Sequence, residues 1–473
     1  MHYEEDCIGK LAVADDVLYG INTTRALHNF NITTERTDSL IFQSMIQIKK
    51  AAAVVNHRGG TLAEQKAKLI VAACNALLLG QHQDDLVAPA IQGSAGTSVN
   101  MNVNEVIAKC AMRMADGVTI LPNDDINQCQ STNDTYPTAG KMAMLKALPP
   151  LLQNIEKMVA VLLDLADRYA NVLKVGRTQL EDAVPTVYGH TFHAYASLFR
   201  RDLTRLRTAA AAEALQQINL GGTAIGTGLN ATDYYRTHVV EALNGISGLK
   251  LALADDMIDA TQNTDTYVAF SGAMKVLAVD LSKFCNDLRL LNSGPQAGFG
   301  ELRLPAKQAG SSIMPGKVNP VIPEVVNQVA FQVIGQDVTI GMAAEAGQLE
   351  LNAFEPIMFR DLLQNERFLT QAINTLVHNC LDGLTVNVEQ CEKNVRHSAV
   401  SATVLNPYLG YAQTTALVKE ALAKQCDIQT LLKEKKILAP DLVDRLFSPE
   451  VMTNQVPTTE SRFVAERSSL QPR

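Results

Sequence analysis

Helical periodicity over two long apolar stretches constrains the fold of this chain more than any other sequence feature. In residues 151–173 and 266–291 apolar side chains recur at i, i+3 and i+4, the spacing of one helix face. Both stretches are apolar on more than one side, which is typical of helices inside a large bundle. Residues 203–218 are rich in alanine and free of glycine and proline, so we predict a helix there too. Because no strand–helix alternation accompanies these stretches, the sequence predicts a mainly α fold.

Composition and charge exclude several classes of protein. The 473 residues carry a net charge of −8, whereas nucleic-acid-binding proteins have a basic surplus on one face. No apolar run is long enough to predict a membrane-spanning helix, and the acidic N-terminus is not a signal peptide. The eight cysteines are dispersed without a CxxC pair, which is typical of reduced thiols. We therefore expect a cytoplasmic protein that binds neither nucleic acid nor membrane.

The sequence predicts neither a metal nor a cofactor. The nine histidines form no HExxH motif. His190 and His193 could share a helix face, but no third ligand is placed near them. The glycines of GGTAIGTG, residues 221–228, do not form the GxGxxG pattern of a dinucleotide-binding turn.

Changes in composition along the chain predict three domains. Residues 1–129 mix short helical pieces with turn-rich stretches, and residues 130–388 are dominated by long helical patterns. Residues 389–473 contain shorter helical patterns and a polar tail. We expect an N-terminal domain, a central helical bundle and a small C-terminal helical domain with these boundaries.

Two polar loops precede apolar helical patterns and are rich in hydrogen-bonding side chains. The stretch GSAGTSVN contributes Thr97, Ser98 and Asn100, and the stretch QSTND contributes Ser131, Thr132 and Asn133. These residue types are also the preferred N-caps of helices, so each loop taken alone is compatible with plain capping. Three consecutive donors in the second loop nevertheless exceed the one or two that a cap requires.

A third polar loop is GRTQLEDAVP, residues 176–185. We expect Arg177 to pair with Glu181 or Asp182 as a structural ion pair. Thr178 and Gln179 then remain as a neutral polar pair for binding a ligand.

The fourth loop, GSSIMPGKVNP, contains a lysine between glycines, but its spacing excludes a nucleotide-binding P-loop. A P-loop has four residues between its glycines and a Ser or Thr after the lysine. Here five residues separate Gly310 from Gly316, and Val318 follows Lys317.

The same stretch predicts a helix start and an anion site. Asn319 followed by Pro320 is typical of an N-cap with proline in the first helical position. A lysine just outside a helix N-terminus favours an anion, because free N–H groups and the positive end of the dipole act together. Lys317 and neutral donors from four loops would suit a small polar ligand with more than one carboxylate.

These loops together resemble the aspartase/fumarase superfamily, whose signature is GSSxMPxKxN. The signature is long and specific, and it runs here from Gly310 to Asn319. The segments ALHNF, QSTND, GRTQLEDAVP, NLGGTAIGTGLN and MAAEAGQLELN resemble the superfamily too, so the similarity covers nearly the whole chain. The resemblance implies a three-domain fold whose long central helices form a twenty-helix core in a homotetramer. It also implies active sites shared between subunits, each built from loops of three of them.

Three local features favour the branch that eliminates ammonia from L-aspartate over the branch that hydrates fumarate. Thr97 and Ser98 match the pattern AGTS of the first branch, and Gln179 stands where fumarases carry a histidine. NPVIPEVVNQV is also closer to the ammonia-lyase form. Fumarate hydration remains an alternative, as does a non-catalytic structural relative. Asp125 and Glu181 depart from the histidine and glutamine common at these positions, and Asp125 puts any inherited second binding site in doubt.

The resemblance implies a role for each candidate residue. Ser311 would remove the proton next to a carboxylate, with the positive field of Lys317 and the N–H groups of its loop supporting the charge. Thr178, Lys317 and Asn319 would hold one carboxylate, and Ser131, Thr132 and Ser312 the other. Thr97, Asn133 and Gln179 would surround the amino group, and Ser98 would also contact the substrate.

Overall fold

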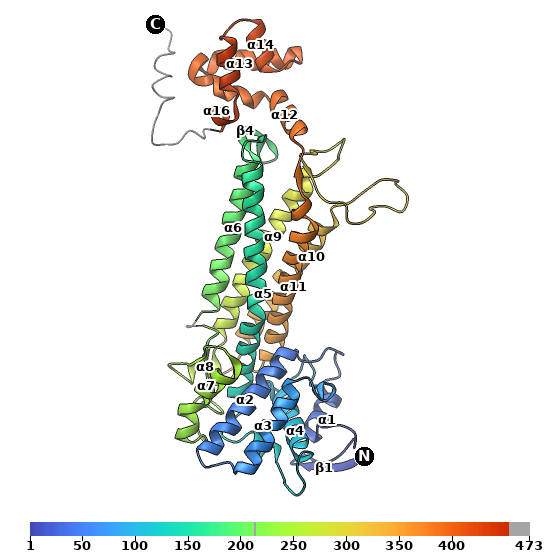
Figure 1. The fold of residues 1–473 in the computed structure, drawn as a ribbon, viewed down its shortest axis with the longest axis vertical. Helices are drawn as coiled ribbons and strands as arrows, with labels where there is room; N and C mark the ends of the chain where they lie inside the picture. The colour runs from blue at the N-terminus through green and yellow to red at the C-terminus, as the bar shows by residue number, and fades with distance from the viewer. Residues whose placement is uncertain (212–213, 454–473) are drawn as a thin grey trace. The chain divides into compact units, whose positions relative to one another are not determined.

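The computed structural model describes residues 1–211 and 214–453, which are mainly α-helical (Figure 1). The chain divides into two compact units, each assembled from three separate segments. Unit 1 comprises residues 1–154, 202–279 and 328–372, and unit 2 comprises residues 155–201, 280–327 and those described from 373 on. Five long helices contribute residues to both units: α5 (Thr132–Arg168), α6 (Tyr188–Ala209), α9 (Asp265–Leu291), α10 (Val321–Glu345) and α11 (Glu355–Asn379).

Unit 1 contains several shorter elements besides its parts of the long helices. Its hairpin pairs β1 (His2–Asp6) with β2 (Gly9–Val13), and the short strands β5 (Gln217–Ile218) and β6 (Ala252–Leu253) pair in parallel. The shorter helices are α1 (Ile21–Asn29), α2 (Ser39–Arg58), α3 (Glu64–Leu78), η1 (Gln83–Asp85), α4 (Thr97–Met112), the π-helix η2 (Pro122–Ile126), α7 (Asp233–Ser247) and α8 (Asp259–Gln262).

Unit 2 contains a longer hairpin and a group of short helices near the C-terminus. The hairpin pairs β3 (Leu173–Thr178) with β4 (Glu181–Val187), and β7 (Leu302–Arg303) pairs with β8 (Thr385–Val386). The short helices are η3 (Leu381–Gly383), α12 (Val388–His397), η4 (Ala399–Leu405), α13 (Asn406–Lys424), α14 (Ile428–Glu434), α15 (Pro440–Leu446) and α16 (Pro449–Met452).

Aromatic packing joins three long helices in unit 1. The Phe359 ring of α11 lies 5.3 Å from the Tyr136 ring of α5 and 5.1 Å from the Tyr267 ring of α9, centroid to centroid. Both distances lie in the range favoured by aromatic pairs. Gly140 of α5 allows this packing, because a Cβ at that position would overlap the Phe359 ring.

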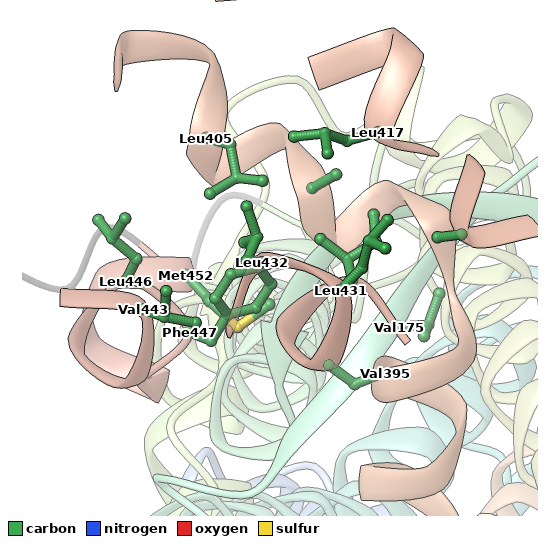
Figure 2. Packing of buried hydrophobic residues seen from close by; sticks show 13 residues of the cluster. Val175, Val395, Leu405, Leu417, Leu431, Leu432, Val443, Leu446, Phe447 and Met452 are labelled. Atoms are coloured by element: carbon green, nitrogen blue, oxygen red, sulfur yellow. The ribbon is translucent and has the colours of Figure 1, made fainter. Parts of the chain in front are cut away.

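The C-terminal helices of unit 2 have an apolar core of their own. Figure 2 shows this cluster, which includes Leu405, Leu431, Leu432, Val443 and Phe447. Val175 of β3 belongs to the same cluster, so the hairpin is packed against these helices through its own side chain.

The structure confirms the predicted mainly α fold and corrects some helix boundaries. The stretch 266–291 lies in α9, and the stretch 151–173 lies in α5 as far as Arg168, because Leu173 begins β3. The helix predicted over 203–218 is wrong beyond Ala209: residues 212–213 lie outside the described part, and Gln217–Ile218 form β5. There the backbone pairing of β5 with β6 outweighs helix propensity. None of the described helices is long and apolar enough to cross a membrane.

Replacing Gly140 with alanine should destabilise the fold. The added methyl group overlaps the Phe359 ring, and overpacking of this kind costs about 2 kcal/mol. Gly245 of α7 is the matched control, since a Cβ there meets nothing within 4 Å and a helical Gly→Ala change stabilises by about 0.5 kcal/mol. Thermal unfolding of Gly140→Ala and Gly245→Ala measures both effects, and equal midpoints would contradict the packing assigned to Gly140.

Candidate active site

The start of helix α5 carries three candidate residues and is held in place by a buried carboxylate. Asp134 is fully buried and accepts hydrogen bonds from the backbone N–H groups of Ser131 at 2.9 Å, Gly221 at 2.9 Å and Thr223 at 3.1 Å. Burial raises the pKa of Asp134 to about 6. The three bonds tie the loop that precedes α5 to the glycine-rich segment 219–228.

Asn133 strengthens the same junction. Its Nδ2 donates to the carbonyl of Ala224 at 2.8 Å, and its own carbonyl accepts from Asn219 Nδ2 at 2.9 Å. Gly226 is required where the segment approaches α8, because a Cβ there would overlap the backbone of Met257 and Ile258. The segment NLGGTAIGTG therefore supports the QSTND loop, a role that its sequence did not indicate.

The start of helix α4 separates its two candidate residues. Thr97 is exposed, whereas Ser98 is buried and its N–H and hydroxyl both lie within hydrogen-bond distance of Ser94 Oγ, at 3.0 and 2.8 Å. Gly96 precedes the helix with φ 87°, and a side chain there would overlap the Tyr136 ring. Ser98 thus contributes to the geometry of the loop, and Thr97 is the residue of the pair that is open to solvent.

A buried amide network lies behind these two helix starts. We use this name for Lys49, Asn100, Asn104, Asn127, Gln130 and Thr132. Lys49 Nζ donates to Asn127 Oδ1 and to Gln130 Oε1, each at 2.9 Å. Asn100 Nδ2 donates to Asn127 Oδ1 at 3.1 Å and to Thr132 Oγ1 at 3.0 Å. The network joins α2, α4 and α5 inside unit 1.

The third candidate loop is the tight turn of the β3–β4 hairpin in unit 2. Thr178 pairs with Glu181, so Gln179 and Leu180 are the two central residues of the turn. Both have left-handed backbone angles, with φ of 54° and 67°. This is the geometry of a type I′ turn, which asparagine and glycine usually supply at lower cost. The strain fixes the direction in which the Gln179 side chain leaves the hairpin.

Arg177 corrects the sequence interpretation of this loop. Its Nη2 pairs with Glu301 Oε1 at 2.6 Å, not with Glu181 or Asp182. Glu301 is completely buried and also accepts from Tyr188 Oη at 3.0 Å and Asn394 Nδ2 at 2.9 Å. Burial alone would raise the pKa of Glu301, but the Arg177 guanidinium outweighs it and holds that pKa below its usual range.

Asp182 has a different partner. Its Oδ2 accepts a hydrogen bond from Ser398 Oγ at 2.7 Å, at the start of η4. The sequence missed both contacts because Glu301 and Ser398 lie more than a hundred residues along the chain, where no local pattern marks them.

The signature loop, residues 310–319, is a closed turn in unit 2. Gly310 N donates to the Lys317 carbonyl at 2.7 Å, and Ala309 forms a backbone bridge with Val318. Ser311 Oγ accepts from the backbone N–H groups of Ile313 at 3.1 Å and Met314 at 2.9 Å. Two donors on one hydroxyl oxygen favour negative charge there.

Asn319 has a role other than the predicted N-cap. Helix α10 begins at Val321, one residue later than predicted, and Asn319 Nδ2 donates to the Gly310 carbonyl at 3.0 Å and so closes the loop. Lys317 and Ser312 are exposed, and no hydrogen bond or ion pair to another described residue occupies either side chain.

The candidate residues therefore form separate groups. In unit 1 the loops at 97–100 and 131–133 are joined through Asn100 and Thr132. In unit 2, among the described residues, no hydrogen bond joins Thr178 or Gln179 to Ser311, Ser312, Lys317 or Asn319. Each group alone presents neutral hydroxyl and amide groups, with Lys317 as the cation of the signature loop.

The side chains that the structure describes include no metal centre. Among the described residues no group of three or more His, Cys, Asp and Glu side chains is arranged to hold a metal ion. Asp125 of the π-helix η2 is buried, and both its oxygens lie 2.8 Å from Lys66 Nζ, so its carboxylate has a structural partner.

Comparison with known proteins shows the family of this chain. Residues 9–335 match the family described as lyase, and residues 402–454 match the family described as fumarase C C-terminus. The chain belongs to the lyase family of the aspartase/fumarase superfamily, and its mainly α fold is that of the superfamily.

Individual members of the superfamily differ in how similar they are to this chain. The chain is 44% identical over 459 residues to an aspartate ammonia-lyase of Helicobacter pylori, covering 96% of this chain and 98% of the relative. A crystal structure of fumarate lyase:delta crystallin from Brucella melitensis has a TM-score of 0.92 and 42% identity, covering 96% and 100% of the two chains. A class II fumarase from Schistosoma mansoni has a similar TM-score of 0.91 but only 31% identity, over 96% of this chain and all of that one.

Buried Lys49 should make the stability of the protein depend on pH. Burial lowers the pKa of Lys49 to about 7, whereas a lysine in an unfolded chain titrates near 10.4. Between these values the unfolded chain binds more protons, so stability rises with pH. We expect the free energy of unfolding of the wild type, relative to Lys49→Met, to increase by up to about 1.4 kcal/mol per pH unit from about pH 7 to pH 10.

Urea unfolding of both proteins across this pH range measures the difference. Lys50→Met is the control, because Lys50 is the next residue of α2 and is partly exposed. Parallel stability curves for wild type and Lys49→Met would show that Lys49 has the same pKa folded and unfolded.

Proposed function

We propose that this chain is a carbon–nitrogen lyase that converts L-aspartate reversibly into fumarate and ammonia. The observation that carries the proposal is the 44% identity to an aspartate ammonia-lyase over nearly the whole of both chains. Fumarate hydration is the second candidate, because a class II fumarase shares the fold with a TM-score of 0.91. The lower identity to that enzyme, 31%, favours the ammonia-lyase.

The proposed chemistry begins with proton removal from the carbon next to one carboxylate of aspartate. The electron pair of the C–H bond moves into that carboxyl group, which becomes a doubly charged aci-carboxylate. The pair then returns to form the C=C bond, while the C–N bond breaks and the ammonium group leaves as ammonia. The largest energetic demand is the charge on the aci-carboxylate, so donors fixed in advance around its oxygens should lower the barrier most.

Ser311 is our proposal for the base. Its oxygen already accepts hydrogen bonds from Ile313 and Met314, which supports a serine oxyanion without a neighbouring histidine. Lys317 would add a positive charge on the same loop. The proton taken from carbon would end on Ser311 Oγ and be lost to solvent between turnovers.

The other candidate residues would bind the substrate. We propose that Thr178, Lys317 and Asn319 hold one carboxylate and that Ser131, Thr132 and Ser312 hold the other, with Thr97, Ser98, Asn133 and Gln179 near the amino group. The neutral amide oxygen of Gln179 can accept a hydrogen bond from an N–H of the amino group without adding charge. No metal or cofactor takes part in this proposal.

Self-association is part of the proposal. Phe331, Val338 and Met342 of α10 are 61%, 60% and 68% exposed, and with Gly335 they follow the spacing i, i+4, i+7, i+11 of one helix face. Such an apolar seam fits packing against helices of other copies. We propose a homotetramer in which loops of different subunits complete each active site.

Domain organisation and location follow the same proposal. The C-terminal helices have their own apolar core, which supports a small domain from residue 389 on, after an N-terminal domain up to residue 129 and a central bundle over 130–388. All eight cysteines are free, which fits a reducing compartment, and we propose the cytoplasm.

The ultraviolet absorbance of fumarate provides the direct test. Purified protein mixed with L-aspartate should develop this absorbance, and fumarate with ammonium should consume it. Development of the absorbance from L-malate but not from L-aspartate would move the assignment to fumarate hydratase. Failure with both substrates would favour a structural relative without catalysis.

Substitutions of Ser311 and of its neighbour Ser312 should have different effects on catalysis. Ser311→Ala should lower kcat at least about a thousand-fold with an unchanged thermal midpoint, because loss of a base or nucleophile removes transition-state stabilisation. Ser312→Ala should mainly raise KM, about ten-fold, because it would lose one hydrogen bond to a charged carboxylate. Steady-state kinetics on aspartate measures both, and similar kcat values for Ser311→Ala and wild type would remove Ser311 as the base.

A further inference from the structure

We propose that Asn100 is a positioning residue that sets the Thr132 hydroxyl as a hydrogen-bond donor toward a substrate carboxylate, so that carboxylates are preferred to carboxamides. The inference rests on the proposed function, in which Thr132 binds a carboxylate. It adds a residue that would touch no substrate atom itself.

The direction of each hydrogen bond in the buried amide network follows from one residue. In its protonated form Lys49 Nζ only donates, and it lies 2.9 Å from one terminal atom of the Asn127 side chain. That atom must therefore be the carbonyl oxygen Oδ1, and Nδ2 of the same amide faces the Gln130 carbonyl at 3.3 Å. The usual ambiguity between the oxygen and nitrogen of an amide is thus resolved at Asn127.

The orientation passes from Asn127 to Asn100. Asn127 Oδ1 is an acceptor, so the Asn100 atom that lies 3.1 Å from it must be the NH2 group. The same NH2 group lies 3.0 Å from Thr132 Oγ1 and supplies its second hydrogen there. Asn100 is only 2% exposed, so water has little access to replace either bond.

Thr132 is left with its own hydrogen to give. Its oxygen accepts from Asn100, and no donation from Thr132 Oγ1 to another described residue is present. Thr132 is 8% exposed, and among the described residues its hydroxyl hydrogen has no protein acceptor. Either oxygen of a carboxylate can accept from this hydroxyl, and the charge strengthens the bond, whereas a carboxamide offers one neutral acceptor oxygen and an NH2 group that does not match.

Asn104 provides a control built into the same helix. It is completely buried, its Nδ2 also donates to Asn127 Oδ1, at 3.3 Å, and its Oδ1 lacks a hydrogen-bond partner just as Asn100 Oδ1 does. Among the described residues no hydrogen bond joins Asn104 to Thr132. An aspartate at 104 therefore adds the same charge to the network without touching the hydroxyl.

The test compares Asn100→Asp with Asn104→Asp. An aspartate at 100 offers an acceptor to Thr132, so the hydroxyl turns inward to donate and presents its lone pair to the ligand. The probes are succinate and its monoamide succinamate, as competitive inhibitors of aspartate turnover and as ligands in calorimetry. We expect Asn100→Asp to weaken the binding of succinate about ten-fold or more relative to the binding of succinamate. Asn104→Asp should leave the ratio of the two dissociation constants near that of the wild type.

Two further variants keep the outcome interpretable. Asn100→Leu removes the donor without adding charge and should weaken succinate a few-fold, and it replaces Asn100→Asp if the latter does not fold. Thr132→Val should weaken the binding of succinate, and in this background a substitution at position 100 should have no further effect on that binding. A thermal midpoint for each variant separates loss of folding from loss of binding.

The possible results distinguish failure of the proposed function from failure of the inference about Asn100. If the wild type does not act on aspartate, the proposed function fails, and calorimetry with succinate still tests Asn100. If Thr132→Val binds succinate as wild type does, Thr132 is not a carboxylate ligand and the inference is wrong. If Thr132→Val is impaired but Asn100→Asp matches Asn104→Asp in its preference between the two probes, the inference alone is overturned.

Discussion

A helix that begins inside a protein leaves backbone N–H groups that another part of the chain must satisfy, and this requirement shapes the candidate site. At the start of α5 the Asn133 N–H donates to Ser131 Oγ, and the buried Asp134 carboxylate accepts from the N–H groups of Ser131 and of residues 221 and 223. Because unpaired polar groups are costly in the interior, the two segments cannot separate without losing several bonds at once. The part of the loop that carries Thr132 and Asn133 is rigid for that reason.

The sequence predicted the helices well because their apolar spacing is a local property. The stretches 151–173 and 266–291 become parts of α5 and α9, which are held by contacts such as that of Tyr267 with Phe359. The alanine-rich stretch 203–218 failed because alanine favours a helix but does not mark its end, and the strand at 217–218 is fixed by a partner at 252–253. The end of a helix depends on contacts with residues far away in the chain, and apolar periodicity carries no information about those contacts.

The residue types of the candidate site were proposed from the sequence, but the contacts between these residues were not predictable from it. Motif resemblance identified Ser311, Gln179 and Thr132, yet the partner of Arg177 was wrong because Glu301 is far away in the chain. Asn319 shows the same limit, since an asparagine before a proline suggests a cap while its amide closes the signature loop onto Gly310. The buried amide network was missed because Lys49 has no local pattern that distinguishes it from a surface lysine.

The turn of the β3–β4 hairpin has a consequence for the way such a protein can change. A left-handed backbone at Gln179 and Leu180 costs each residue about 1–2 kcal/mol relative to glycine. Selection for stability alone would drive this turn toward Asn-Gly, and the glutamine amide would disappear with the strain. The hairpin can therefore be made more stable or keep a side chain suited to an amino group, but one substitution cannot achieve both, and heat-resistant variants should arise at other positions.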